Sequence, residues 1–255
     1  MSIIRPFKGI RPRADLASAI AALPYDVYNS EEAREIVAAE PKSFLQIDRA
    51  ETLLPKGTNP YSEAVYKTAS ETLNRMIYEG SFLQDKEPCY YLYALTMNGR
   101  TQTGLVGCAS IDDYCNNVIL KHENTLEAKE QDRIRHIDAC SAQTGPIFLA
   151  YRADKKLGEI IKNVRLTPEV YDFTSDDGIR HEVWRIMSTI VDISKIFEAI
   201  PHLYIADGHH RAASAVKVGL KRRAEDLHFS ETKEYNYFLS VLFPADELAI
   251  YDYNR

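Results

Sequence analysis

Residues 203–215 carry the densest group of side chains able to do chemistry, in the order LYIADGHHRAASA. An apolar run ends in a carboxylate, a glycine, two histidines and an arginine, and small residues follow at once. This order predicts a strand, a tight turn at Asp207-Gly208 and a helix that begins near His210 or Arg211. A helix start presents unpaired backbone N–H groups and the positive end of the helix dipole, so it suits an anion.

The charges at this turn point to phosphate chemistry. His209, His210 and Arg211 supply donors and positive charge. Asp207 would repel a bare phosphate, but the two signs are compatible if a divalent cation bridges carboxylate and phosphate, or if Asp207 acts on a proton. A zinc site is the weaker alternative, because neighbouring histidines diverge on a helix and the chain has no H-E-x-x-H or C-x-x-C spacing. An ordinary polar loop is the structural alternative.

A second polar group, Lys121-His122-Glu123, stands just before another predicted helix. Glu123 would be a general base if burial made its carboxylate basic enough to accept a proton near neutral pH. The alternative is an exposed helix N-terminus, where the helix dipole already favours an acidic residue. A phosphate site without a base would bind but not transfer efficiently, so we expect Glu123 to lie near the histidine motif.

Turn signals and apolar spacing predict the elements of the first half. Asn59-Pro60 is typical of a helix start, and Gly80 of its end. Strand-like runs over 90–97 and 100–111 flank Asn98-Gly99, which predicts a β-hairpin. The first third therefore mixes helices with an antiparallel sheet.

The second half continues in the same style. Asn124 or Thr125 is expected to cap a helix, and Ser194 a shorter one. Residues 147–151 form a predicted buried strand that contains no charge, and Trp184 is a predicted core residue. The first of these helices should keep most of its charged side chains on its surface, namely Glu127, Lys129, Glu130, Asp132 and Arg133.

The remaining elements complete the predicted order. Asp177-Gly178 joins strand pieces at 169–173 and 179–186. The helix after the histidine motif should end near Gly219, and 237–243 and 248–253 are expected to be the final strands. A boundary near Asp113 divides the chain into regions 1–113 and 114–255. Because the last strand-like run has no polar tail, we expect the sequence to be part of a longer protein.

Composition narrows the class of protein. The chain has 255 residues, of which 45% are hydrophobic and 27% charged, with a formal net charge of −6. An acidic chain without an apolar leader or a long apolar run is not expected to bind nucleic acid or membranes and is expected to be cytoplasmic. The cysteines show no metal-binding spacing and are expected to be reduced, partly buried thiols. They are Cys89, Cys108, Cys115 and Cys140.

Several motifs, taken in order, resemble one bacterial and archaeal family, the domain of unknown function 1015 family. They are RPFKGIRP, LPYDV, IDDY, KHENT followed by KEQDR, DG with HEVW, YIADGHHRAASA and the final YNR. The resemblance covers essentially the whole chain. Members of the family usually continue beyond the YNR element, and the family name implies no activity.

The DGHHR block in the second half also resembles the matching block of free serine kinases in the ParB/sulfiredoxin-like superfamily. This resemblance implies a mixed α+β fold, with a ParB/sulfiredoxin-like nucleotide-binding region over 114–255 after a smaller α+β region over 1–113. It implies Mg²⁺ as cofactor, ADP or ATP as phosphoryl donor, and free L-serine as an example of the acceptor. The cysteine of sulfiredoxins and the glutamate of ParB proteins are missing after the glycine.

The same resemblance implies roles for individual residues. Glu123 would take the proton of the substrate hydroxyl, and Asp207 would assist that hydroxyl or hold Mg²⁺ through phosphate oxygens. The expected phosphate- and nucleotide-binding residues are Gly208, His209, His210, Arg211, His122 and Lys8. Lys8 comes from the cation-rich RPFKGIRP stretch, for which a solvated terminus is the alternative.

Three functions are therefore open. The first is a small-molecule kinase whose partners are a nucleotide and a small hydroxylated substrate. The second is a non-catalytic nucleotide-binding regulatory module, which needs no base beside its phosphate site. The weakest is a metal-dependent phosphohydrolase. An oligomer is compatible with all three.

Overall fold

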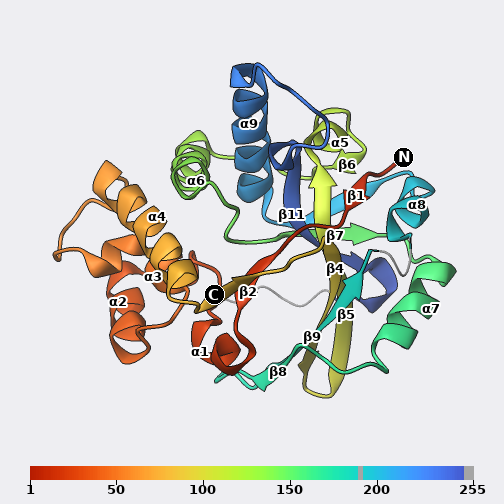
Figure 1. Cartoon of the computed structure of the whole chain (residues 1–255), viewed down its shortest axis with the longest axis horizontal. Helices are drawn as coiled ribbons and strands as arrows, with labels where there is room; N and C mark the ends of the chain where they lie inside the picture. Colours follow the sequence, from red (N-terminus) through yellow and green to blue (C-terminus); the bar gives the residue numbers. More distant parts are fainter. Residues whose placement is uncertain (189–191, 250–255) are drawn as a thin grey trace.

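The computed structural model describes residues 1–188 and 192–249. Within them, nine strands form a central sheet and nine α-helices surround it (Figure 1). The sheet strands are β1 (Ile4–Arg5), β4 (Cys89–Met97), β5 (Arg100–Ser110), β6 (Ile119–Leu120), β7 (Ile147–Tyr151), β8 (Tyr171–Thr174), β9 (Arg180–Met187), β10 (Leu203–Asp207) and β11 (Tyr237–Pro244). A separate two-stranded sheet pairs β2 (Ile10–Pro12) with β3 (Phe82–Gln84). The expected mixed α+β class is confirmed.

The helices fall into groups along the chain. They are α1 (Ala17–Ile20), α2 (Ser30–Ala39), α3 (Leu45–Asp48), α4 (Glu63–Tyr78), α5 (Ile111–Cys115), α6 (Glu127–Cys140), α7 (Lys155–Val164), α8 (Ile193–Glu198) and α9 (His209–Glu225). We call α1 to α4 the helical lobe, which lies at the left of Figure 1, while α7 and α8 lie at the right.

The strand order in the main sheet is β6-β10-β7-β11-β5-β4-β9-β8, and β1 pairs with β5 beside this path. β6 with β10 and β7 with β11 are parallel, and the other neighbours are antiparallel. Strands on both sides of residue 113 are thus hydrogen-bonded in one sheet. The division at that residue stays a prediction about sequence organisation.

Both predicted hairpins are confirmed. Asn98 and Gly99 have positive φ angles of 51° and 77° and join β4 to β5. Gly178, with φ of 79°, lies in the turn between β8 and β9. These turns need positive φ, which glycine and asparagine adopt most easily, so the local sequence was sufficient to predict them.

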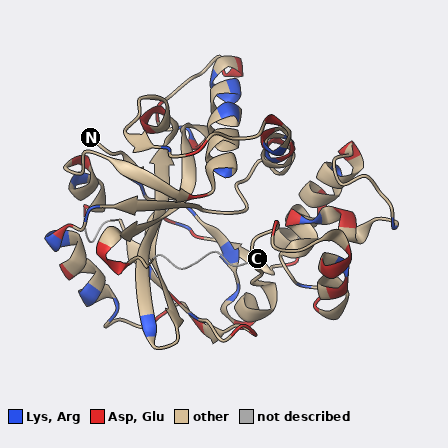
Figure 2. Ribbon diagram, turned by 180° about the vertical axis from the view of Figure 1, so that it is seen from behind, with Lys and Arg blue, Asp and Glu red and all other residues tan. Residues whose placement is uncertain are grey.

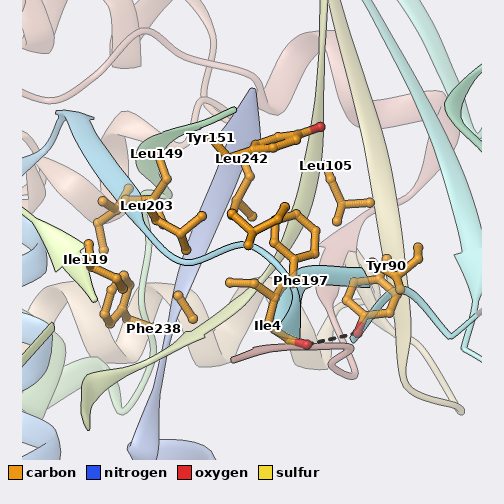
Figure 3. Packing of buried hydrophobic residues seen from close by; sticks show 14 of the residues in the cluster. Ile4, Tyr90, Leu105, Ile119, Leu149, Tyr151, Phe197, Leu203, Phe238 and Leu242 are labelled. Carbon is orange, nitrogen blue, oxygen red and sulfur yellow. Dashed lines mark hydrogen bonds between the residues drawn. The ribbon is translucent and has the colours of Figure 1, made fainter. Parts of the chain in front are cut away.

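The two faces of the sheet carry different layers. The register puts Leu92, Leu105 and Leu242 on one face, within the main apolar core. There Phe197 of α8 packs on Tyr151, with ring centroids 5.4 Å apart (Figure 3). The opposite face, which includes Tyr93 and Leu239, looks toward α9 and the helical lobe. Trp184 is buried in the core as expected.

α6 lies between α4 and α9, and this position overturns one expectation. Glu130 and Arg133 were expected on the surface but are only 4% and 8% exposed. They are buried with partners: Lys217 of α9 pairs with Glu130, and Arg133 pairs with Asp132 at 2.7 Å. The Lys and Arg bands on α9 are visible in Figure 2. Charge alone did not indicate exposure, because Lys217 of α9 and Asp132 of α6 itself supply the counter-charges.

α9 is longer than expected, since it runs through Gly219 to Glu225. A Cβ atom on Gly219 would lie 2.4 Å from the carbonyl oxygen of Tyr235. The glycine therefore allows the chain before β11 to approach the helix closely, and it does not end the helix. By contrast, Gly80 has φ of 75° and follows α4 as expected.

Three predicted helix caps are wrong. α4 begins after Ser62, while Asn59 instead accepts the backbone N–H of Tyr61. α6 begins after Leu126 without a side-chain cap, so neither Asn124 nor Thr125 caps it. The Thr125 hydroxyl is bonded to the Glu130 carboxylate instead. Asn59 and Thr125 thus make other local contacts in place of the expected caps.

The third wrong cap lies at α8. Asp192 caps this helix by accepting the Lys195 N–H, whereas Ser194 donates to the carbonyl of Ile4 at 2.9 Å. Of the expected strand over 248–253, the described residues 248–249 are not in a strand, and 250–253 lie outside the described residues.

Cysteines and hydropathy complete the description. Cys89, Cys108 and Cys140 are buried free thiols, whereas Cys115 is exposed. Burial raises the pKa of Cys140 to about 12, so this thiol stays protonated near neutral pH. Over 1–188 and 192–249, no helix has both the length and the apolar character needed to cross a membrane.

Candidate functional site

The candidate site is centred on the start of α9. β10 ends at Asp207, Gly208 takes a left-handed conformation with φ of 91°, and the helix begins at His209. The chain thus follows the expected order of strand, turn and helix, with the helix starting one residue early. Within the described residues, the N–H groups of His209, His210 and Arg211 have no protein acceptor. Such a helix start attracts negative charge.

Arg211 lies back over this turn. Its Nη2 donates to Asp207 Oδ2 at 2.6 Å, and its Nη1 donates to the carbonyl of Pro146 at 2.8 Å. A Cβ atom on Gly208 would lie 3.0 Å from the Arg211 guanidinium, so glycine suits this approach as well as the turn. The Asp207 side chain is 70% exposed, so a ligand can reach its carboxylate while Arg211 holds it.

Glu123 reaches the same helix start from the second motif. Its Oε1 lies 3.3 Å from His209 Nδ1, which confirms the expected proximity. The parallel pairing of β6 with β10 explains it, because the ends of neighbouring parallel strands lie at one edge of the sheet. The His209 side chain is 3% exposed and that of Glu123 is 54% exposed. The pair therefore combines a buried imidazole with an accessible carboxylate.

A backbone hydrogen bond to its ring indicates the tautomer of His209. Its Nε2 accepts the backbone N–H of His122 at 3.5 Å, so the ring proton is on Nδ1 and faces Glu123. Burial lowers the pKa of His209, although Glu123 opposes this, and the neutral ring is favoured near pH 7. His209 therefore presents its Nδ1–H to the Glu123 carboxylate at close range.

The other two histidines hold the loop before α6 against the start of α9. His210 Nε2 accepts the backbone N–H of Leu126 at 3.0 Å. The His122 ring packs edge-on against His209, with centroids 4.3 Å apart. Both contacts join this loop to α9, so these side chains are partly structural.

A cavity of about 380 Å³ lies beside this turn, between the helical lobe and the second face of the sheet. Arg211, Gly145 and Pro146 line one part of it, and Tyr93 and His181 of the sheet line another. Its volume is within the usual range of small-molecule sites. His122, Glu123, His209 and His210 do not line it, so the cavity and the Glu123–His209 pair meet the start of α9 from different sides.

Sequence reasoning missed a buried polar cluster on the cavity wall. Arg133 lies over the Tyr25 ring, 4.0 Å from its centroid. Asp48 accepts a hydrogen bond from Thr144 Oγ1 at 2.6 Å. His136 donates to the carbonyl of Ile47, and burial lowers its pKa. The motifs LPYDV and KEQDR contributed to the family resemblance, and they are the only signal that could have drawn attention to Tyr25 and Arg133.

Comparison with known proteins now places the chain. A family model described as "Protein of unknown function (DUF1015)" matches residues 4–255. The chain belongs to the DUF1015 family. No curated protein and no solved structure matches it significantly.

In this DUF1015 chain, Lys8 is the expected site residue that the structure does not bring to the helix start. It is exposed and lines a separate hollow with Gly219 and Arg222, farther along α9. Its neighbour Arg11 is held by Asp85 at 3.0 Å. The RPFKGIRP stretch is therefore held by the ion pair of Arg11 with Asp85. It is neither a phosphate-binding stretch at the helix start nor a solvated terminus.

Few side chains at this DUF1015 site could serve as ligands of a metal ion. Among the described residues, no group of three or more His, Cys, Asp or Glu side chains could hold a metal ion. A zinc site, the weaker alternative, uses three or four protein ligands. Asp207 is a single accessible carboxylate beside an anion site, and Mg²⁺ is commonly held by one or two carboxylates together with substrate phosphates.

Proposed function

We propose that this DUF1015 chain is a Mg²⁺-dependent phosphotransferase that moves a phosphoryl group from ADP or ATP to the hydroxyl of a small molecule such as free L-serine. The observation that carries the proposal is the contact of Glu123 with His209 at the start of α9, beside Asp207. It joins a candidate base to a candidate phosphate site across a long sequence separation.

The phosphate end of the proposal rests on the helix start. Free N–H groups at residues 209–211 and the Arg211 guanidinium would hold the transferring phosphates. Phosphoryl transfer depends mainly on positioning and on neutralising charge, and it requires little covalent chemistry from the protein. A helix start with an arginine and an accessible carboxylate supplies these elements.

Asp207 fits a metal role in this scheme. Its carboxylate is mostly exposed and would hold Mg²⁺ together with phosphate oxygens of the nucleotide. When bound, the ion would neutralise part of the negative charge on the phosphates. Arg211 would keep Asp207 oriented through the hydrogen bond that it already donates.

The acceptor end rests on Glu123. Its carboxylate would accept the proton of the substrate hydroxyl as the oxygen approaches the phosphoryl group. The close contact with the buried His209 would keep the carboxylate in place. Because Glu123 is half-exposed, the acceptor would approach from the solvent side of the helix start.

A product screen tests the proposal. Purified protein is incubated with Mg²⁺ and ADP or ATP, together with free hydroxy amino acids and other small alcohols, and mass spectrometry detects phosphorylated products. We expect one acceptor to give a product that is lost without Mg²⁺. Absence of any transfer, with tight nucleotide binding by calorimetry, would contradict the kinase and leave the second candidate.

The second candidate is a non-catalytic nucleotide-binding regulatory module. One observation favours it: the Arg211 guanidinium already bonds both Asp207 and the carbonyl of Pro146. A phosphate that drew Arg211 away would release the loop at Pro146 and so signal binding. Nucleotide-dependent faster hydrogen exchange in that loop, without turnover, is the expected result for this candidate.

A further inference from the structure

The cavity beside Arg211 has two carboxylates in its lining, Asp48 and Asp177, and Asp48 is the more buried of the two. The Asp48 side chain is 13% exposed and lines the cavity. Among the described residues, no Lys or Arg lies within ion-pair distance of it, and its nearest basic group is His136 at 3.9 Å. Burial favours the neutral form of His136, so it does not balance the charge. A buried carboxylate in this position needs further hydrogen-bond donors.

We infer that this cavity binds the nucleoside part of the phosphoryl donor, with Asp48 accepting hydrogen bonds from the ribose hydroxyls. The inference rests on the proposed function, because it places the remainder of a nucleotide whose phosphates lie at the start of α9. A carboxylate that accepts ribose hydroxyls is a common element of nucleotide sites.

The position of the cavity assigns it to the donor and not to the acceptor. Arg211 lines it, whereas Glu123 and His209 do not. A ligand that fills the cavity can therefore place its phosphates at Arg211 without occupying the Glu123 side. The acceptor hydroxyl must contact Glu123, so it needs that other, more exposed side.

The walls suit a planar base. Tyr93 and His181 are nearly parallel, with an interplanar angle of 14°, and the Tyr93 hydroxyl is bonded to His181 Nδ1 at 2.7 Å. Both rings line the cavity, and Tyr25 lines it from the helical lobe. Aromatic side chains of this kind stack on any base, because every base presents a π-face. The cavity volume of about 380 Å³ is adequate for a nucleoside.

Calorimetry with three probes tests the inference in the presence of Mg²⁺: ATP, adenosine and inorganic tripolyphosphate. Asp48→Asn should weaken binding of ATP and adenosine by about 10- to 150-fold, the range for a lost hydrogen bond to a charged group. Binding of tripolyphosphate should be unchanged. Arg211→Ala should show the opposite pattern, with weaker binding of tripolyphosphate and unchanged binding of adenosine. Asp15→Asn, an exposed aspartate on the helical lobe, is the matched control.

A second variant guards against a folding defect in Asp48→Asn. Ala22 is exposed at the edge of the cavity, so Ala22→Phe should fill the cavity without disturbing the core. It should weaken binding of ATP and adenosine and spare tripolyphosphate. If the wild type binds ATP and both folded variants bind it equally well, the cavity assignment is wrong and the proposed function stands. If the wild type binds neither ADP nor ATP, both proposals fail.

Discussion

Two aspartates in this chain are each bonded to arginine, yet their surroundings differ sharply. The Asp85 side chain is 4% exposed and is surrounded by Arg11, Arg185 and the Tyr91 hydroxyl. Burial alone would raise the pKa of Asp85, but hydrogen bonds from Arg11 and Tyr91 lower it below its usual range. The Asp207 side chain is 70% exposed and has Arg211 as its cationic partner within the described residues.

The difference separates a structural carboxylate from an available one. Every partner of Asp85 comes from the protein, and together they connect the N-terminal segment to β4 and β9. Asp207 keeps most of its side chain exposed and lies beside the N–H groups of residues 209–211, which have no protein acceptor within 1–188 and 192–249. The same residue types thus stabilise the fold in one place and remain free for a ligand in the other.

The largest expected effect is a loss of protein stability when the buried Asp85 cluster is broken. Asp85→Ala leaves Arg11 and Arg185 without their carboxylate, and we expect the free energy of unfolding to fall by about 3 kcal/mol. This is the lower end for a broken buried pair, because both arginines keep some contact with solvent. Urea denaturation measures it. Asp207→Ala is the comparison variant and should lose less than about 1 kcal/mol, as exposed pairs do. If Asp85→Ala and Asp207→Ala lose equal free energies of unfolding, the distinction between a structural and an available aspartate is wrong.

The next largest expected effect is on turnover at the candidate site around Glu123. Glu123→Gln keeps the size of the side chain but cannot accept the hydroxyl proton, so turnover should fall by about 10²-fold or more. Nucleotide affinity should stay within about twofold. Rates are measured with the acceptor found in the product screen, and Glu127→Gln, an exposed neighbour at the start of α6, serves as control. Full activity in Glu123→Gln would show that Glu123 is not the base.

Nucleotide affinity should respond to Arg211. Its removal deletes a charge-assisted contact to phosphate, so Arg211→Ala should weaken ADP or ATP binding by about 10- to 150-fold. Calorimetry with Mg²⁺ gives the affinity. Lys8→Ala should bind as the wild type does, because Lys8 lies in a separate hollow. Unchanged affinity in a folded Arg211→Ala variant would assign Arg211 to holding Asp207 and Pro146.

The smallest effect concerns pH. Burial lowers the pKa of His136, His181 and His209 below the value of about 6.5 expected in the unfolded chain. Below that pH, the unfolded state binds more protons than the folded state, so stability should fall as the solution is acidified from pH 7 toward 5. Urea denaturation at several pH values tests this. A flat profile over that range would mean that the three histidines protonate without cost in the folded protein.

Local sequence was sufficient where one turn decides the structure. Asn98-Gly99, Asp177-Gly178 and the glycine before α9 each require backbone angles that few residues tolerate, so the elements around them could be predicted. The proximity of Glu123 to the histidine motif was predicted from chemical need. The structure supplied its physical cause, the parallel pairing of β6 with β10.

Contacts between residues far apart in the sequence could not be predicted from local turn signals. Asp48 and Thr144 are 96 positions apart and meet only because the helical lobe lies over the sheet. The burial of Arg133 depends on Tyr25 and Asp132, which no periodicity connects. The cap expected at Ser194 failed for the same reason, since its hydroxyl donates to the carbonyl of Ile4 at the other end of the chain.

The pairing of β6 with β10 also sets an order of events during synthesis. Within the described residues, β10 is the only sheet partner of β6, and His122 and His209 are 87 positions apart. The hairpin of β4 and β5 can form as soon as its own residues have left the ribosome, whereas Glu123 has no histidine to contact until α9 begins to emerge. An unfinished chain can thus hold its sheet nucleus and still lack the assembled pair, so the chemistry proposed for this protein is acquired only after α9 has been made.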